Sequence, residues 1–186
     1  MSNSNNSTTD NNSTTDNSSA KLSHIKNVKS MFHMVKEFNN SFNMVSHDTP
    51  QRNIFTEDKK TVDLRWKLID EECKELKEAI DTHDFGEVRD ALSDIMYVVL
   101  GAADAFGINI ESDFTEVHLS NMSKLCSSEE EAKQTVLSYQ KKFEASESPY
   151  DSPYYYKLPN QEKWVVKNKS TGKALKSINY TPVNFK

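Results

Sequence analysis

The sequence predicts an all-α fold, a helical bundle, followed by a C-terminal extension that contains a short β-hairpin. Apolar residues recur at helical spacing in two long stretches, 60–81 and 84–107, and in shorter stretches on either side. Only four glycines are present, and none forms a glycine-rich phosphate loop, which removes the usual α/β nucleotide-binding motifs. Beyond Ser146, prolines and clustered tyrosines replace the helical pattern.

The first expected helix runs from about residue 22 to residue 42, and a loop with Pro50 follows it. The two long helices come next and are joined by a turn at 83–86. A shorter helix should be capped by Ser112 or Asp113 and end at Leu125, and another should be capped by Ser127 or Ser128 and end near residue 145. The strands expected for the hairpin are 164–166 and 174–175. The apolar stripe expected on the first helix consists of Phe32, Val35, Phe38 and Phe42.

Composition divides the chain into three parts. Residues 1–21 are almost wholly Asn, Ser, Thr and Asp, which cannot bury apolar surface, so we expect a disordered tail. Residues 22–146 should form the all-α domain. Residues 147–186 should form a basic, aromatic extension.

Acidic residues stand where the helix 60–81 should be apolar. At about 100° per residue, Glu72 lies within the apolar arc, Glu75 lies at its edge and Glu71 lies one step further out. An ordinary amphipathic helix would carry Leu or Val at position 72. A surface ion-pair lattice is the plainer explanation for Glu71, and Arg65 could neutralise Glu72. Few other cations share that arc, so a bound cation is the stronger hypothesis.

The second long helix is apolar nearly all round, so it should be central and buried. Asp90, Asp94 and Tyr97 share one face of it. An ionised Asp at such depth would cost several kcal/mol unless it were paired, protonated or bound to a metal. Glu87 has a plainer role, because Asp84 and Glu87 have the spacing of a capping box.

The chain resembles the all-α nucleoside triphosphate pyrophosphohydrolases, the MazG-like and phosphoribosyl-ATP pyrophosphohydrolase-like superfamily. Its E-E-x-x-E motif is matched by Glu71, Glu72 and Glu75, and the final Asp of its E-x-x-D motif is matched by Asp94. Further similarity lies in DALSDIMYVVLGAADAFGI, EVHLSNMSKL and GKALKSINYTPVNFK. On this alignment the Glu of E-x-x-D falls on Ala91, and Asp90, or else Glu87, could supply the missing carboxylate. An Arg of the related branch is replaced by Leu119.

The resemblance implies attack of water on a nucleoside triphosphate and release of pyrophosphate and a nucleoside monophosphate. Glu72, Glu75, Asp90 and Asp94 would bind Mg²⁺, with Mn²⁺ as a substitute, because oxygen ligands without thiols suit hard cations. Two such ions would neutralise the four carboxylates. Glu71 is the candidate that accepts the proton. The expected substrate contacts are Tyr97, His118, Asn121, Lys124 and Lys176.

Composition limits the other classes of function. There is no apolar run of the roughly 20 residues that a membrane span needs and no secretion signal, so we expect a cytoplasmic protein without membrane contact. The net charge of -5 argues against stable nucleic-acid binding. The apolar second helix has more surface than a short bundle can cover, which predicts a homo-oligomer. The resemblance implies a dimer or a tetramer.

Three functions therefore compete. The first is a Mg²⁺-dependent nucleoside triphosphate pyrophosphohydrolase that serves house-cleaning or control of the nucleotide pool. The second is a phosphoribosyl-ATP pyrophosphohydrolase, and the third is a non-catalytic helical interaction module whose metal site has decayed. Stabilisation by Mg²⁺ separates the third from the others, and a nucleotide screen separates the first two.

Overall fold

The computed structural model describes residues 29–185 of the chain, which form two compact units, residues up to Ile108 and residues 109 onward. The helices and the small sheet confirm the all-α fold with a C-terminal hairpin. The predictions for residues 1–21 and for the start of the first helix concern residues that lie outside the described part of the chain. The expected domain limits therefore remain predictions, and we describe each unit by itself.

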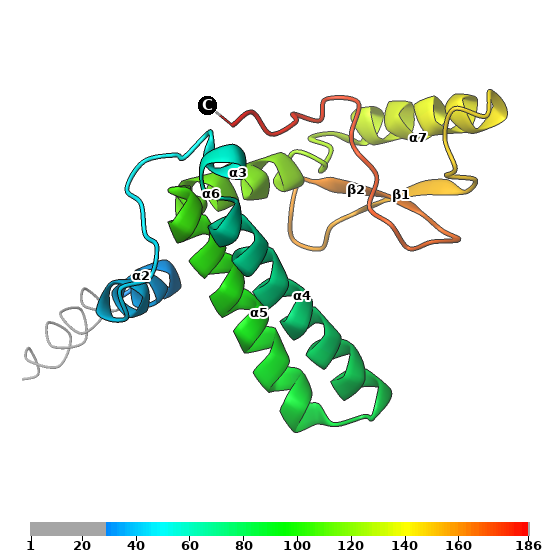
Figure 1. Ribbon diagram of the computed structural model, residues 1–186. Coiled ribbons are helices and arrows are strands. Elements are labelled where there is room, and N and C mark those ends of the chain that lie inside the picture. Colours follow the sequence, from blue (N-terminus) through cyan, green and yellow to red (C-terminus); the bar gives the residue numbers. More distant parts are fainter. Residues whose placement is uncertain (1–28, 186) are drawn as a thin grey trace, which may run out of the picture. The chain divides into compact units, whose positions relative to one another are not determined.

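The first unit is built on a long antiparallel helical hairpin. Helix α4 (Lys59–Asp81) and helix α5 (Phe85–Phe106) lie side by side, joined by a short turn (Figure 1). Asp58 and Asp84 start these helices, since each carboxylate accepts a backbone N–H of its own first turn. Both helices follow the limits that the sequence predicted.

Two further helices complete this unit, α2 (Met31–Ser41) and the short α3 (Ile54–Glu57). Helix α2 packs on α5 through Val35 and Asn39, which are its buried residues. Gly107 ends α5 at φ 69°, and a Cβ there would lie 1.9 Å from the carbonyl oxygen of Thr49. Only glycine therefore lets the 43–53 segment close over the end of α5.

The second unit places two helices with the hairpin. They are α6 (Ile110–Met122) and α7 (Glu129–Glu144), which begin after the caps Asn109 and Ser128. The expected caps of α6 were wrong, because the Asn109 side chain accepts the N–H of Ser112 one turn earlier. The core of this unit consists of Cys126, Ala132, Val166 and Leu175, with Trp164 and three tyrosines packed around it.

The partner strand of the hairpin differs from the expectation. Strand β1 (Pro153–Lys157) pairs antiparallel with β2 (Trp164–Asn168), with Tyr155 opposite Val166. The expected partner 174–175 contributes only an isolated bridge between Lys167 and Ala174. The tyrosine run 154–156 forms the longer pairing because aromatic residues favour strands and Tyr155 packs against the core.

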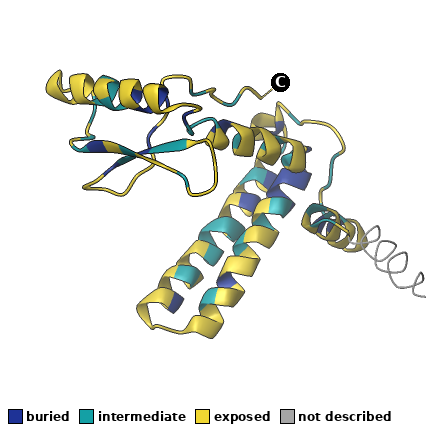
Figure 2. Ribbon diagram, turned by 180° about the vertical axis from the view of Figure 1, so that it is seen from behind, coloured by how far each residue is buried: buried dark blue, intermediate teal, exposed yellow. Residues whose placement is uncertain are grey.

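Burial also differs from the expectation for two helices. Leu92, Met96 and Val99 of α5 are exposed, and its buried residues are Ala91 and the segment 101–105 (Figure 2). Phe38 and Phe42 of the expected α2 stripe are exposed as well. Asp94 is an exposed carboxylate, so its expected depth was wrong. In the described part of the chain, no single helix is both long and apolar enough to cross a membrane, although one bent pair of helices passes by length and composition alone.

Candidate metal and nucleotide site

The hairpin brings the acids of α4 and α5 to the same level. Gly101 lies against Arg65 of α4, because a Cβ there would lie 3.0 Å from Nη1 of Arg65. Glu72 lies seven residues after Arg65, and Asp94 lies seven residues before Gly101. Since the helices are antiparallel with equal rise, Glu72 faces Asp94. Glu75 correspondingly lies beside Asp90.

Glu72 is the most perturbed member of this acidic cluster. Its side chain is half-buried, and its Oε2 atom is buried without any hydrogen-bond partner among residues 29–185. Burial raises the pKa of Glu72, and repulsion from four neighbours raises it further; these are Glu75, Asp94, Glu71 and Asp90. Buried polar atoms are almost always hydrogen-bonded, so an orphaned carboxylate oxygen among like charges fits a site that receives a cation.

The other acids differ in their surroundings. Within residues 29–185, no three His, Cys, Asp or Glu side chains lie close enough together to form a complete ligand set. Asp90, Asp94 and Glu75 are exposed and carry no ion pair, so they are free to change rotamer. Glu71 is half-buried, and its carboxylate lies 3.4 Å from Nζ of Lys67. The donor set of carboxylate oxygens suits a hard divalent cation such as Mg²⁺.

Glu87, the alternative fourth ligand, lies further along the hairpin. It is exposed in the first turn of α5, at the level of Ala79. Glu87 and Asp90 themselves have E-x-x-D spacing, a register that the sequence reasoning did not consider. If Glu87 and Asp90 form the E-x-x-D motif, no carboxylate of the motif is missing. Asp94 is then an additional acid, one helical turn after Asp90. Glu87, Asp90 and Asp94 share one face of α5, so all three can serve the same site.

Sequence reasoning also missed a buried carboxylate at the upper end of the hairpin. Asp104 is 0% exposed and accepts hydrogen bonds from Nδ2 of Asn39 at 2.8 Å and Oγ of Ser46 at 2.9 Å. Nζ of Lys36 lies 3.8 Å away. These contacts tie α2 and the following loop to α5. Asp104 stands within an apolar stretch, GAADAF, which was the available signal.

Arg65 forms no ion pair with Glu72 within the described residues, and the acid whose charge acts on it is Asp104. Arg65 is 5% exposed, and burial lowers its pKa while the charge of Asp104 opposes that shift. Its Nη2 makes one long hydrogen bond, 3.5 Å, to the carbonyl oxygen of Val45. Glu72 is thus left without the cationic partner that the sequence had suggested.

Tyr97 lies one turn beyond Asp94 on α5 and is half-exposed, at 39%. The ring of Phe38 meets it edge-on, with 5.7 Å between centroids. The predicted substrate residue Tyr97 is therefore in the same unit as the acidic cluster, with an aromatic neighbour from α2.

The remaining predicted substrate residues lie in the second unit. His118 and Asn121 are exposed on α6, and Nζ of Lys124 donates to Oδ1 of Asn121 at 2.7 Å. Lys176 stacks over the ring of Tyr180 at 4.3 Å. The hydroxyls of Tyr180 and Ser120 are 2.9 Å apart, so the C-terminal segment lies along α6. The structure thus brings Lys176 near α6, which carries His118 and Asn121 and ends two residues before Lys124.

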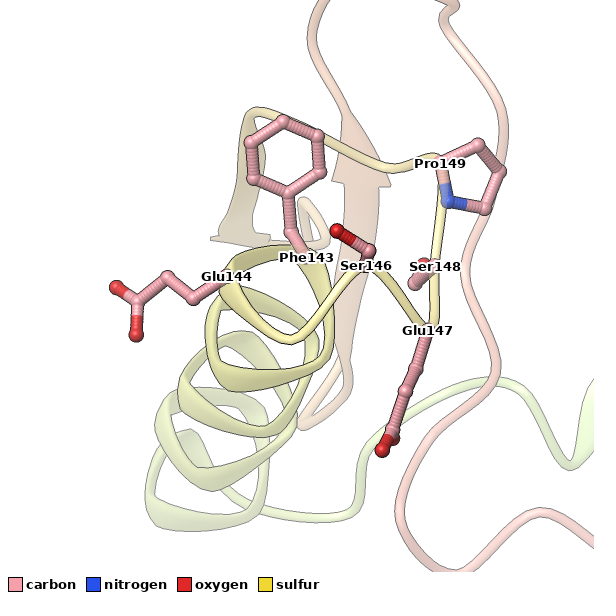
Figure 3. A pocket seen from close by; sticks show the side chains of 6 residues that line it. All are labelled: Phe143, Glu144, Ser146, Glu147, Ser148 and Pro149. Carbon is pink, nitrogen blue, oxygen red and sulfur yellow. The ribbon is translucent and has the colours of Figure 1, made fainter.

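An open hollow at the end of α7 is not part of this site. It is lined by Phe143, Glu144 and the segment 146–149, and Figure 3 shows the two glutamate side chains, Glu144 and Glu147, pointing in different directions. Its charged lining groups are acidic and do not converge. It offers no cation to a phosphate.

Comparison with known proteins finds a family match over the segment that contains the α4–α5 helical hairpin. The model of the phosphoribosyl-ATP pyrophosphohydrolase family matches residues 35–121. An uncharacterized protein of Acanthamoeba polyphaga mimivirus is 41% identical over 80 residues, which are 43% of this chain and 32% of that protein. The chain thus matches about a third of that relative's length.

Residues 35–121, which include α4, α5 and the acidic cluster, match the model of the phosphoribosyl-ATP pyrophosphohydrolase family, which belongs to the all-α MazG-like superfamily. The match supports a hydrolase that acts on phosphoric anhydride bonds. Families of this kind typically use divalent metal ions. The predicted resemblance and fold are confirmed.

Proposed function

We propose that this protein hydrolyses a (deoxy)nucleoside triphosphate to the monophosphate and pyrophosphate in a Mg²⁺-dependent reaction. The observation that carries the proposal is the orphaned Oε2 of Glu72, surrounded by the carboxylates of Glu71, Glu75, Asp90 and Asp94. The match of this segment to a pyrophosphohydrolase family supports the same reaction.

Glu72, Glu75, Asp90 and Asp94 would hold the ion, and Mn²⁺ would be accepted in place of Mg²⁺ because the donors are all oxygens. A bound divalent ion would offset the negative charge of the triphosphate and polarise its phosphoryl oxygens. Glu72 binds while ionised, so a cation and a proton compete for its raised-pKa carboxylate.

Glu71 is the proposed general base. It is half-buried beside the cluster, with its carboxylate 3.4 Å from Nζ of Lys67, so it is placed to accept a proton from the attacking water. Tyr97 would contact the substrate in this unit. Lys124 and Lys176 would supply positive charge for phosphate oxygens. His118 would make a further polar contact, and Asn121 would offer both a hydrogen-bond donor and an acceptor.

Phosphoribosyl-ATP is the second candidate substrate, because the family model that matches bears that name. A screen of pyrophosphate release from nucleoside triphosphates, deoxynucleoside triphosphates and phosphoribosyl-ATP separates the two. Melting curves with and without Mg²⁺ should accompany the screen. If pyrophosphate is released from phosphoribosyl-ATP and not from the nucleoside or deoxynucleoside triphosphates, phosphoribosyl-ATP is the substrate. Absence of both turnover and Mg²⁺-dependent stabilisation would refute a metal-dependent hydrolase.

A further inference from the structure

The two-stranded sheet of the second unit has one covered face and one open face. Helix α7 packs on the sheet (Figure 1), and Tyr155 and Val166 belong to the core on that side. Because successive side chains of a strand point to opposite faces, Tyr154 and Tyr156 point away from this core. They are 42% and 36% exposed. The open face therefore presents two tyrosine rings to solvent.

The two rings lie nearly parallel and have lysines beside them. Their centroids are 6.0 Å apart, and their planes differ by 25°. Lys167 is the pairing partner of Tyr154 across the β-hairpin, and its Nζ lies 5.9 Å from the centroid of the Tyr156 ring. The N–H of Lys169 donates to the carbonyl oxygen of Ser152 at 2.8 Å, which extends the ladder by one step on the same side. The tyrosine–lysine face consists of Tyr154, Tyr156, Lys167 and Lys169.

The charge around this face is positive, although the whole chain has a net charge of -5. Residues 153–180 contain six lysines and one acid, Glu162, whose carboxylate lies 2.6 Å from Nζ of Lys157. At physiological salt, exposed charges more than about 8–10 Å apart are largely screened. The local positive charge, and not the net charge of the chain, therefore decides which partner approaches the β-hairpin.

The lysines of the face do not neutralise acids of the same chain. In the described part of the chain, neither Lys167 nor Lys169 forms an ion pair. Asp151 lies just before β1, but its carboxylate accepts hydrogen bonds from Ser170 at 2.6 Å and from Asn168 at 3.1 Å. An ion-pair lattice is the ordinary explanation for surface lysines, and it does not account for these two.

A ligand that alternates flat rings with negative charges matches this face. In a single-stranded nucleic acid the base faces are free to stack on tyrosine rings, and the phosphates beside them attract lysines. In a duplex the base faces are covered by neighbouring bases, so a duplex offers mainly phosphate charge. An acidic peptide would match the lysines but would leave the two rings without stacking partners.

We propose that the tyrosine–lysine face binds single-stranded nucleic acid, RNA or DNA. Bases stack on Tyr154 and Tyr156, and phosphates lie beside Lys167 and Lys169. The face lies outside residues 35–121, the segment that matches the pyrophosphohydrolase family. This binding goes beyond the proposed hydrolysis, and neither activity depends on the other.

The first test uses the full, unmodified chain and fluorescein-labelled oligothymidylate and oligouridylate strands of about 12 nucleotides. EDTA is present, so the acidic cluster holds no metal and repels the strands. Fluorescence anisotropy should show binding whose logarithm falls with log[salt] at a slope of about -1.4 or steeper, as expected for two phosphates or more. A duplex of the same length should bind about tenfold more weakly. The strand that binds more tightly identifies RNA or DNA as the ligand. Lack of binding to both strands at low salt, or equal affinity for the duplex, would overturn the proposal.

The second test removes the rings. Tyr154→Ala and Tyr156→Ala should each weaken binding of the strand about tenfold, because each removes one stacking partner. Tyr154→Phe and Tyr156→Phe keep the rings and should keep the native affinity, so they are the matched controls. Melting curves show whether each variant is folded. Unchanged affinity in the folded alanine variants, or an equal loss in the phenylalanine variants, would refute stacking on these rings.

The third test removes the charges and does not touch the rings. The double variant Lys167→Gln and Lys169→Gln should lower affinity at low salt and make the salt slope shallower by about 1.4. Lys60→Gln removes an exposed lysine of α4 in the other unit, and it should leave both quantities unchanged. Vesicles of phosphatidylserine and phosphatidylcholine, sedimented with the native protein, test a membrane surface as the alternative partner. Binding to these vesicles without binding to the strands, or a native salt slope in the double variant, would contradict the proposal.

Discussion

Glu72 in the first unit and Glu131 in the second are the same residue type in opposite electrostatic surroundings. Oε2 of Glu72 has no hydrogen-bond partner in the described part of the chain, and burial together with repulsion from neighbouring acids raises the pKa of Glu72. Glu131 is 8% exposed, and burial alone would raise its pKa. Hydrogen bonds from Ser127 and Ser177 outweigh burial and hold the pKa of Glu131 below its ordinary value.

The direction of the pKa shift separates acids that stabilise the fold through hydrogen bonds from acids whose carboxylates are available to bind a ligand. Glu131 joins the start of α7 to the C-terminal segment through Ser177. Asp151 stabilises the β-hairpin in the same way, and hydrogen bonds from Ser170, Ser152 and Asn168 lower its pKa to about 2. Asp104 does so in the first unit. Among the described residues, the carboxylates around Glu72 do not link separate segments of the chain. Their loss should therefore affect activity more than stability.

Asp94→Asn should have the largest effect. It removes one ligand charge from the cluster without changing shape, so we expect turnover to disappear, a loss beyond the roughly 10–100-fold caused by outer partners of metal ligands. The melting temperature without Mg²⁺ should not fall. Glu78→Gln, an exposed acid on the solvent side of α4, is the control for pyrophosphate release. Near-normal activity of Asp94→Asn at saturating Mg²⁺ would remove Asp94 from the site.

Asp104→Asn should have the largest effect on stability. The substitution weakens the hydrogen bonds that Asn39 and Ser46 donate to a fully buried carboxylate, and it removes the charge that acts on the buried Arg65. We therefore expect a loss of about 3 kcal/mol or more. Urea unfolding measures this change. Asp63→Asn, which breaks only an exposed pair with Lys59, should change the free energy of unfolding by less than about 0.5 kcal/mol. Equal effects of the two variants would contradict the assignment of Asp104 as an anchor.

Glu131→Gln should destabilise the protein by about 1–3 kcal/mol at neutral pH, because several hydrogen bonds to a charged group are weakened. The pKa of Glu131 is lowered in the folded state, so its contribution is present above the ordinary value of 4.5 and is lost as pH falls through the lower folded value. The gap between the variant and the native protein should therefore close in acid. A gap independent of pH would mean that the charge of Glu131 does not matter.

Glu72→Gln should act in the opposite direction and more weakly. The pKa of Glu72 is raised in the folded state, so the native protein loses stability as pH rises from 4.5 through the raised value. Without metal, the variant should be the more stable protein at neutral pH, by less than about 1 kcal/mol, since the side chain is partly solvated. Melting curves with and without Mg²⁺ measure both effects. A variant that keeps the full Mg²⁺ stabilisation would exclude Glu72 as a ligand.

Lys176→Gln should have the smallest effect. An exposed lysine near a phosphate contributes modestly, so KM should rise about two- to fivefold while Mg²⁺ affinity stays the same. Lys163→Gln, an exposed lysine before β2, serves as the matched control. An unchanged KM would leave Lys176 only its structural contact with Tyr180.

Local sequence signals predicted most of the helices. Helical periodicity and side-chain caps act over a few residues, which is why the limits of α4, α5 and α7 agree with the prediction. The E-E-x-x-E motif likewise identified the segment that matches the family. The sequence did not predict that β1 pairs with β2 in the β-hairpin. Strand pairing depends on the core that Tyr155 and Val166 share, and that core joins residues far apart in the chain.

The sequence by itself determined the helices, the resemblance to a family and the set of acids from which a cation site can form. Only the tertiary structure decided which acid is buried and which is free. Asp94 and Asp104 both lie in one apolar helix, and nothing in that helix distinguishes them. The difference arises because α2 and its loop bring Asn39 and Ser46 to Asp104, whereas Asp94 faces another carboxylate across the hairpin. Hydrogen-bond partners are supplied by distant segments, so burial and charge state follow from packing and not from local spacing.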